Sequence, residues 1–133
     1  MQNIDCVINK LKKEFDLVIP EDYVDFVKGI DMFQYSWDII EVGEEEIEIN
    51  HFLGYDADVT SRDLYKWYLF ADSERLDYLT FAMGFGNEEF AIKVKGDNLG
   101  EVALIAPDQD GNIEIKKICN NFSEFIKKFN KGE

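Results

Sequence analysis

The spacing of apolar residues changes along the chain, and this change limits the folds that the sequence can adopt. Near both ends, apolar residues recur every three or four positions, a spacing typical of amphipathic helices. In much of the middle, apolar and polar residues alternate, as in half-buried strands. Helices are predicted over residues 4–15, 19–30, 60–70 and 120–129, and strands over residues 33–42, 46–54, 77–84, 88–94, 100–106 and 112–118.

The strand segments differ in which residues they bury. Residues 100–106 are apolar on both faces, which predicts a strand in the interior of a sheet. Asp110-Gly111, just before residues 112–118, is a hairpin signal. Strict alternation predicts two core-facing sets, one of Ile47, Ile49, His51 and Leu53 and another of Leu79, Phe81 and Met83.

The order of these segments predicts the fold class. Two helices come first, then two strands, a helix, three or four strands and a last helix, without the strand–helix alternation of a parallel sheet. We therefore expect a single α+β domain over residues 1–133. It would contain a mainly antiparallel sheet of about five or six strands with helices packed on one face.

The composition is that of a globular domain inside the cell. Hydrophobic residues make up 46% of the chain and aromatic residues 14%, which is ample for one core. The two cysteines, Cys6 and Cys119, do not form a framework of spaced pairs, and no apolar leader or membrane-spanning stretch is visible. These features predict a cytoplasmic protein.

Negative charge is concentrated in one part of the sequence. The formal net charge is −14, and residues 29–61 contain nine acidic residues without a Lys or Arg. Binding to nucleic acid or to an anionic membrane is disfavoured, because both require clustered basic residues. A basic protein partner is the electrostatically favoured alternative.

The sequence contains no catalytic or cofactor-binding motif. With His51 as the single histidine, zinc motifs built on paired histidines are excluded. Gly84 and Gly86 lack the third glycine of a dinucleotide loop. The acidic run at residues 41–48 could be a metal site, a catalytic carboxylate pair, a solvated strand face or a docking surface. Alternation along a strand disfavours convergence on a metal, and we expect no cofactor, no metal and no enzymatic activity.

Several segments resemble the SUKH superfamily. The N-terminal signature is similar at Ile19, Pro20, Tyr23, Phe26 and Val27, and the segments at residues 50–56, 79–94 and 118–129 are also similar to those of the family. Two features depart from the family pattern: residues 28–33 replace its usual Asn-Gly-Gly, and its glycine-rich loop keeps only Gly84 and Gly86.

This resemblance implies a non-catalytic binding protein with an α+β fold. Many bacterial members are immunity proteins that neutralise a toxin, often a nuclease, and fungal members regulate cell-wall synthesis through protein contacts. The first hypothesis is therefore an immunity protein that binds a basic toxin domain through an acidic surface. The alternative is an intracellular regulatory or scaffold module unrelated to toxins, and the oligomeric state stays open. The predicted contact residues are Glu44, Glu45, Glu46, Glu48, Asp56, Asp58 and Tyr55.

Overall fold

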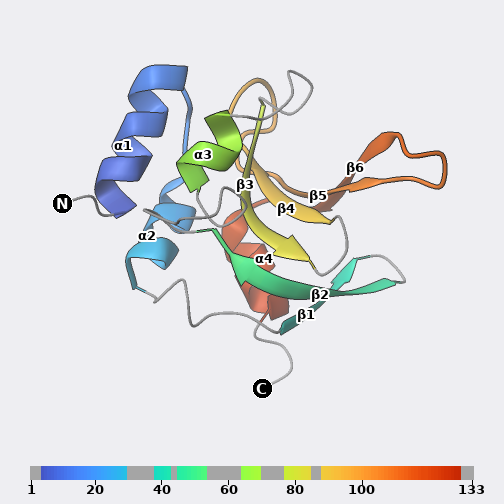
Figure 1. Cartoon of the computed structure of the whole chain (residues 1–133). Coiled ribbons are helices and arrows are strands. Elements are labelled where there is room, and N and C mark those ends of the chain that lie inside the picture. The colour runs from blue at the N-terminus through green and yellow to red at the C-terminus, as the bar shows by residue number, and fades with distance from the viewer. Residues whose placement is uncertain are drawn as a thin grey trace.

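The protein has the predicted α+β architecture, with one antiparallel sheet and helices packed against it (Figure 1). The structure is a computed structural model. It describes residues 4–29, 38–42, 45–53, 64–69, 77–84 and 88–129. Within these residues the sheet has six strands, at the upper limit of the prediction.

The strands lie side by side in the order in which they occur along the chain, β1-β2-β3-β4-β5-β6, and each neighbouring pair is antiparallel. Their bounds are Asp38–Val42 for β1, Glu45–Phe52 for β2, Tyr78–Gly84 for β3, Glu89–Lys93 for β4, Val102–Pro107 for β5 and Ile113–Cys119 for β6. The prediction that residues 100–106 form an interior strand is confirmed, because β5 pairs on both sides and its residues 102–105 are buried.

The two N-terminal helices, α1 (Ile4–Phe15) and α2 (Glu21–Gly29), form where helical spacing predicts them. Val7, Ile8 and Leu11 of α1 are buried, as their common stripe requires. Pro20 directly precedes α2, and its carbonyl oxygen accepts a hydrogen bond from the Val24 amide at 3.2 Å. A proline here costs nothing, because the first amides of a helix have no partner within the helix.

The last helix, α4 (Phe122–Phe129), covers one face of the sheet and lies behind the strands in Figure 1. The ring of Phe125 lies 5.1 Å from that of Phe81 on β3 and 5.9 Å from that of Phe90 on β4. Phe122 packs edge-on against Tyr23 of α2 at 5.1 Å. Because these aromatic side chains are buried, the main core lies between this face, α2 and α4.

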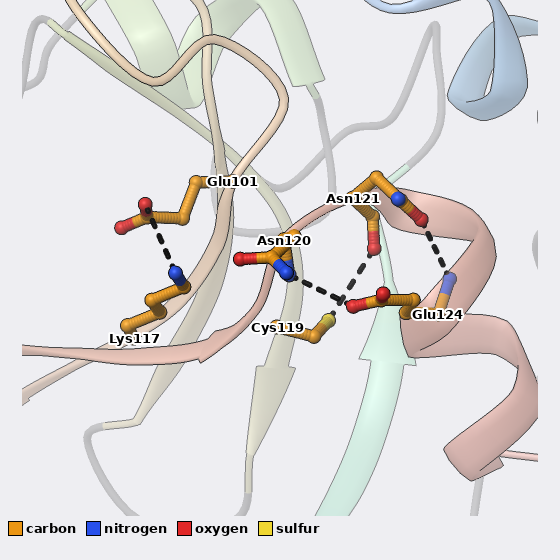
Figure 2. A network of polar contacts seen from close by, with 6 residues as sticks. All are labelled: Glu101, Lys117, Cys119, Asn120, Asn121 and Glu124. Carbon is orange, nitrogen blue, oxygen red and sulfur yellow. Dashed lines mark hydrogen bonds and ion pairs between the residues drawn. The ribbon is translucent and has the colours of Figure 1, made fainter.

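Side-chain hydrogen bonds fix the start of α4 (Figure 2). Asn121 Oδ1 accepts the Glu124 amide at 2.9 Å, and Glu124 Oε2 accepts the Asn120 amide at 3.0 Å. This arrangement is a capping box, although the glutamate reaches one residue further back than in the standard motif. Asp22 Oδ2 accepts the Ser123 amide at 3.1 Å, which links α2 to this helix start.

The short helix α3 (Leu64–Leu69) packs against α1. Leu64 and Tyr68 are buried. The ring of Tyr68 lies 5.0 Å from that of Phe15, and the Tyr65 hydroxyl donates a hydrogen bond to the Glu14 carboxylate. This hydrogen bond is the main reason that the pKa of Tyr65 is raised.

A β-bulge in β3 overturns one predicted face of the sheet. Leu79 is in register with Ile92, whereas Met83 is in register with Glu89. Ile92 and Glu89 are three residues apart in β4 and so belong to opposite faces. Met83 therefore does not share a face with Leu79, because the extra residue of the bulge reverses the alternation.

A second bulge does the same in β2. Ile47 and Ile49 are buried, as predicted. Between Ile49 and His51 the register shifts, so that Ile49 pairs with Gly84 and His51 pairs with Met83. His51 is thus placed on the face of Met83, so the predicted single face is wrong beyond Ile49, although Leu53 is buried as predicted.

On the face opposite Phe90, a buried carboxylate joins α3 to the sheet. Glu89 is only 5% exposed, and its Oε1 accepts hydrogen bonds from Trp67 Nε1 at 2.9 Å and from Thr80 Oγ1 at 2.8 Å. Phe90 follows Glu89 directly and packs on α4, so alternation places Glu89 on the other face. The Trp67 side chain therefore reaches the face that α4 does not cover.

Candidate functional site: the acidic end of the sheet

The topology brings acidic residues from three hairpins to one end of the sheet. Because neighbouring strands are antiparallel, β1, β3 and β5 end where β2, β4 and β6 begin. We call this the acidic end. Its acidic residues are Glu41 near the end of β1, Glu45 and Glu46 at the start of β2, Glu88 just before β4, and Asp108 and Asp110 between β5 and β6.

The β1–β2 hairpin contributes the densest group of carboxylates. Its register places Glu41 directly opposite Glu46, and Glu48 opposite Ile39. Glu46 and Glu48 alternate along β2 with the buried Ile47, so positions 46 and 48 belong to the face away from the core. Like charges at directly opposite positions of a strand pair are in general destabilising.

The β5–β6 loop contributes two more carboxylates. Asp108 and Asp110 are both exposed. The Asp108 carboxylate accepts the amides of Asp110 at 2.9 Å and of Asn112 at 3.0 Å, a side-chain turn that holds the loop in place. Gly111 has a φ of 85°, which only glycine adopts without strain, so the predicted Asp-Gly turn is confirmed.

The structure describes only part of the predicted contact surface. Glu45, Glu46 and Glu48 lie in β2. Glu44, Tyr55, Asp56 and Asp58 lie outside the described residues. The last described residue before Tyr55 is Leu53, which follows β2 at the end of the strand opposite Glu45.

Sequence reasoning missed the acidic residues on the neighbouring hairpins. Glu88, Asp108 and Asp110 are far from residues 44–48 in the sequence and were assigned to ordinary strands and turns. One signal could have identified them: successive hairpins in an antiparallel meander place every second turn at the same end of the sheet. That inference requires the strand order of the sheet, which was not predicted.

The acidic residues of this end favour electrostatic attraction of positively charged groups. Among the described residues, no group of three His, Cys, Asp or Glu side chains is arranged to hold a metal ion. At the other end of β4, Lys93 is the last residue of the strand and Lys95 follows it, and the acidic residues Asp77, Asp97 and Glu101 lie at that end too.

Comparison of the sequence with known proteins identifies the family of the chain. The SMI1/KNR4 family (SUKH-1) matches residues 6–128. No curated protein and no solved structure matches the chain. Within the described part of the chain, every helix is too short or too polar to cross a membrane. Because the match spans nearly the whole sequence and includes the resemblance noted above, the chain belongs to the SMI1/KNR4 family (SUKH-1).

Proposed function

We propose that this protein is a non-catalytic immunity protein that binds a basic toxin domain and blocks it with the acidic end of the sheet. Family membership supports a protein-binding role. The net charge of −14 supports a basic partner, and the concentration of carboxylates at one end of the sheet supports a localised contact.

The register of the β1–β2 hairpin carries this proposal. Glu41 and Glu46 stand opposite each other although an opposite charge at either position would stabilise the strand pair. Sequences violate such local rules mainly at functional sites, where another requirement outweighs stability. A positively charged partner relieves this repulsion on binding and so gains affinity from it.

The expected contribution of this surface is mainly kinetic. Complementary charge steers two proteins toward a productive encounter and raises the association rate by roughly 10- to 1,000-fold, with steep dependence on ionic strength. The dissociation rate depends more on the few buried contacts at the centre of an interface. Glu44, which precedes Glu45, is proposed as a further carboxylate of this surface, whereas Tyr55, Asp56 and Asp58 follow Leu53 at the opposite end of β2 and are left out of it.

The first experiment identifies the partner and its activity. The tagged chain is purified from its native cell, and the protein that accompanies it is identified and expressed alone. The proposal requires a basic protein that harms the cell when expressed alone and is silenced when this chain is co-expressed. A partner that is harmless on its own would contradict the immunity role.

The second experiment locates the contact. The variant Glu45→Lys/Glu46→Lys changes the net charge by the same amount as the control Asp25→Lys/Asp97→Lys, whose two residues are exposed and lie away from the acidic end. The association rate with the identified toxin at low salt should fall strongly for the first variant and little for the control. Equal effects would show that only net charge matters, and would remove the acidic end from the interface.

A regulatory or scaffold role is the second candidate, and an apolar surface at the other end of the sheet favours it. Val18 is 53% exposed and Leu99 is 45% exposed. The Val18 amide donates to the Val94 carbonyl at 2.9 Å, and a Cβ on Gly100 would lie 3.6 Å from Pro20 Cγ. The α1–α2 connection and the β4–β5 turn therefore meet there. Loss of partner binding in Val18→Asp or Leu99→Asp, with weak salt dependence, would support this role.

A further inference from the structure

The outer strand β6 is exposed along most of its length. It is the last strand of the sheet, and among the described strands none pairs with its outer side. Residues 111–117 are all exposed, including Ile113 at 40% and Ile115 at 41%. In Figure 1 the β5–β6 hairpin extends beyond the rest of the domain on the right. Such an edge offers unpaired backbone groups and apolar side chains to a further strand.

β6 carries both positive and negative side chains, whereas the chain as a whole is strongly acidic. Lys116 Nζ lies 3.3 Å from Glu114 Oε1 on the same face of the strand, and Lys117 Nζ lies 3.8 Å from Glu101 Oε2 (Figure 2). Lysines on an edge strand usually discourage pairing with another strand. A partner strand that places carboxylates opposite them would remove this obstacle.

We infer that β6 is the interface of a two-fold dimer, in which it pairs antiparallel with β6 of a second copy of this chain about Ile115. In this register, Ile115 stands opposite its own symmetry mate. Glu114 stands opposite Lys116 of the second copy, and Lys116 opposite Glu114, so the sequence of β6 is complementary to itself in charge. These two Glu114–Lys116 pairs are related by the two-fold axis.

The charges also select this register over its neighbours. A shift of two residues in one direction would place Lys116 opposite itself, and a shift in the other direction would place Glu114 opposite itself. Both arrangements oppose like charges and are destabilising. A shift of one residue would pair positions from different faces, which the two-fold axis forbids. Only pairing about Ile115 combines an apolar centre with two opposite-charge pairs.

The position of β6 limits the repulsion between two acidic chains. Glu45 and Glu46 lie in β2, which is four strand spacings from β6, or about 19 Å along the sheet. This exceeds the screening length of about 8 Å at physiological ionic strength. The two-fold axis also points the acidic ends of the two copies in opposite directions. A dimer through β6 therefore leaves Glu45 and Glu46 of both copies accessible, although Asp108 and Asp110 lie beside the interface, and the inference does not depend on the proposed function.

The strand pairing predicts a weak dimer, because one short strand pair buries less surface than a standard stable interface. Sedimentation of the wild-type chain over micromolar to millimolar concentrations should show a transition from 15.5 kDa to twice that mass. Glu114→Lys and Lys116→Glu should each weaken the dimer by roughly tenfold, since each opposes like charges at two symmetric pairs. The double swap Glu114→Lys/Lys116→Glu should restore it.

The double swap is the decisive control, because it keeps the composition and net charge and changes only which residue carries which charge. Asp97→Lys alters the net charge as much as Glu114→Lys, but in the β4–β5 turn, and should leave the dimer unchanged or slightly stronger. Circular dichroism verifies that each variant is folded. A chain that stays monomeric at all concentrations, or a double swap no better than the single variants, would overturn the inference. A monomeric chain whose binding to a different protein is abolished by Ile115→Lys would also overturn the inference. In that case β6 would pair with a strand of that protein.

Discussion

Glu41 and Glu46 occupy directly opposite positions in the β1–β2 hairpin, at the end of the sheet where carboxylates from three hairpins gather. Like charges at directly opposite positions destabilise a strand pair, whereas under the proposed function the same two carboxylates attract a basic partner. Stability and binding therefore place opposite demands on the same pair of residues, and a single substitution can separate the two.

Glu46→Lys should stabilise the protein and weaken partner binding together. A lysine opposite Glu41 converts a repulsive cross-strand pair into an attractive one, worth about 0.5–1 kcal/mol in the free energy of unfolding. Urea denaturation measures the stability, and association kinetics with the identified partner measure the binding. Glu46→Gln should give an intermediate result for both. A variant that is stabilised but binds as fast as wild type would show that this pair is outside the interface.

Glu89→Ala should be among the more destabilising single substitutions. It leaves the Trp67 indole N–H and the Thr80 hydroxyl without their acceptor in a buried site, at a cost of about 2–4 kcal/mol. Glu89→Gln keeps an acceptor oxygen and should cost about 1 kcal/mol. Chemical denaturation checks both, with the exposed Glu114→Gln as the control. If alanine costs no more than glutamine, the carboxylate does not join α3 to the sheet.

Tyr23→Phe should stabilise the protein slightly at neutral pH. The Tyr23 hydroxyl is buried and has no hydrogen-bond partner among the described residues. Removing an unsatisfied buried hydroxyl should therefore raise the free energy of unfolding by up to about 1 kcal/mol. Thermal and urea denaturation at pH 7 measure this difference. A loss of more than that amount would mean that the hydroxyl has a favourable contact.

The same substitution should change the response to alkali. Burial raises the pKa of Tyr23 well above its usual value of about 10. Above about pH 10 the unfolded chain loses this proton while the folded chain keeps it, so stability falls by about 1.4 kcal/mol per pH unit. Tyr23→Phe lacks this contribution, and its advantage over wild type should grow between about pH 10 and 12. An advantage that stays constant over this range would contradict the predicted pKa shift.

Asn121→Ala should destabilise the start of α4 and, through it, the whole core. The side chain of Asn121 accepts the Glu124 amide, and loss of such a cap costs about 1 kcal/mol. Asn121→Asp keeps the acceptor and should be nearly neutral. The neighbouring Asn120→Ala is a matched control, because Asn120 contributes its backbone amide to the helix start. Equal stabilities of Asn121→Ala and Asn120→Ala would exclude the cap.

Local patterns predicted the elements of this fold well. The helical stripe of Val7, Ile8 and Leu11 and the capping box at Asn121 are short-range signals, which depend on residues within two turns of a helix. The interior position of β5 followed from its apolar character on both faces. In each case the physics that decides the structure acts between near neighbours in the sequence.

Long-range features could not be predicted in the same way. The bulge that places Met83 opposite Glu89 has no composition signal, and it changed which residues share a face. In the sequence, Glu89 looks like any solvated strand residue, because its hydrogen-bond partner Trp67 is 22 residues away. The acidic end likewise depends on strand order, which alternation within one strand does not specify. Contacts between distant segments decide all three features.

The strand order also has a consequence for how the chain reaches this structure. Every strand of the sheet pairs with the next strand in the sequence, so sheet formation requires no pairing between remote segments. The aromatic face of β3 and β4 is nevertheless covered by α4, which follows all six strands. During synthesis, α2 can pack on part of that face first, because the ring of Tyr23 lies 5.8 Å from that of Phe81, but the part that Phe122 and Phe125 cover stays open until α4 leaves the ribosome. Exposed apolar surface promotes aggregation, so the chain is more prone to aggregate before α4 is made than after it.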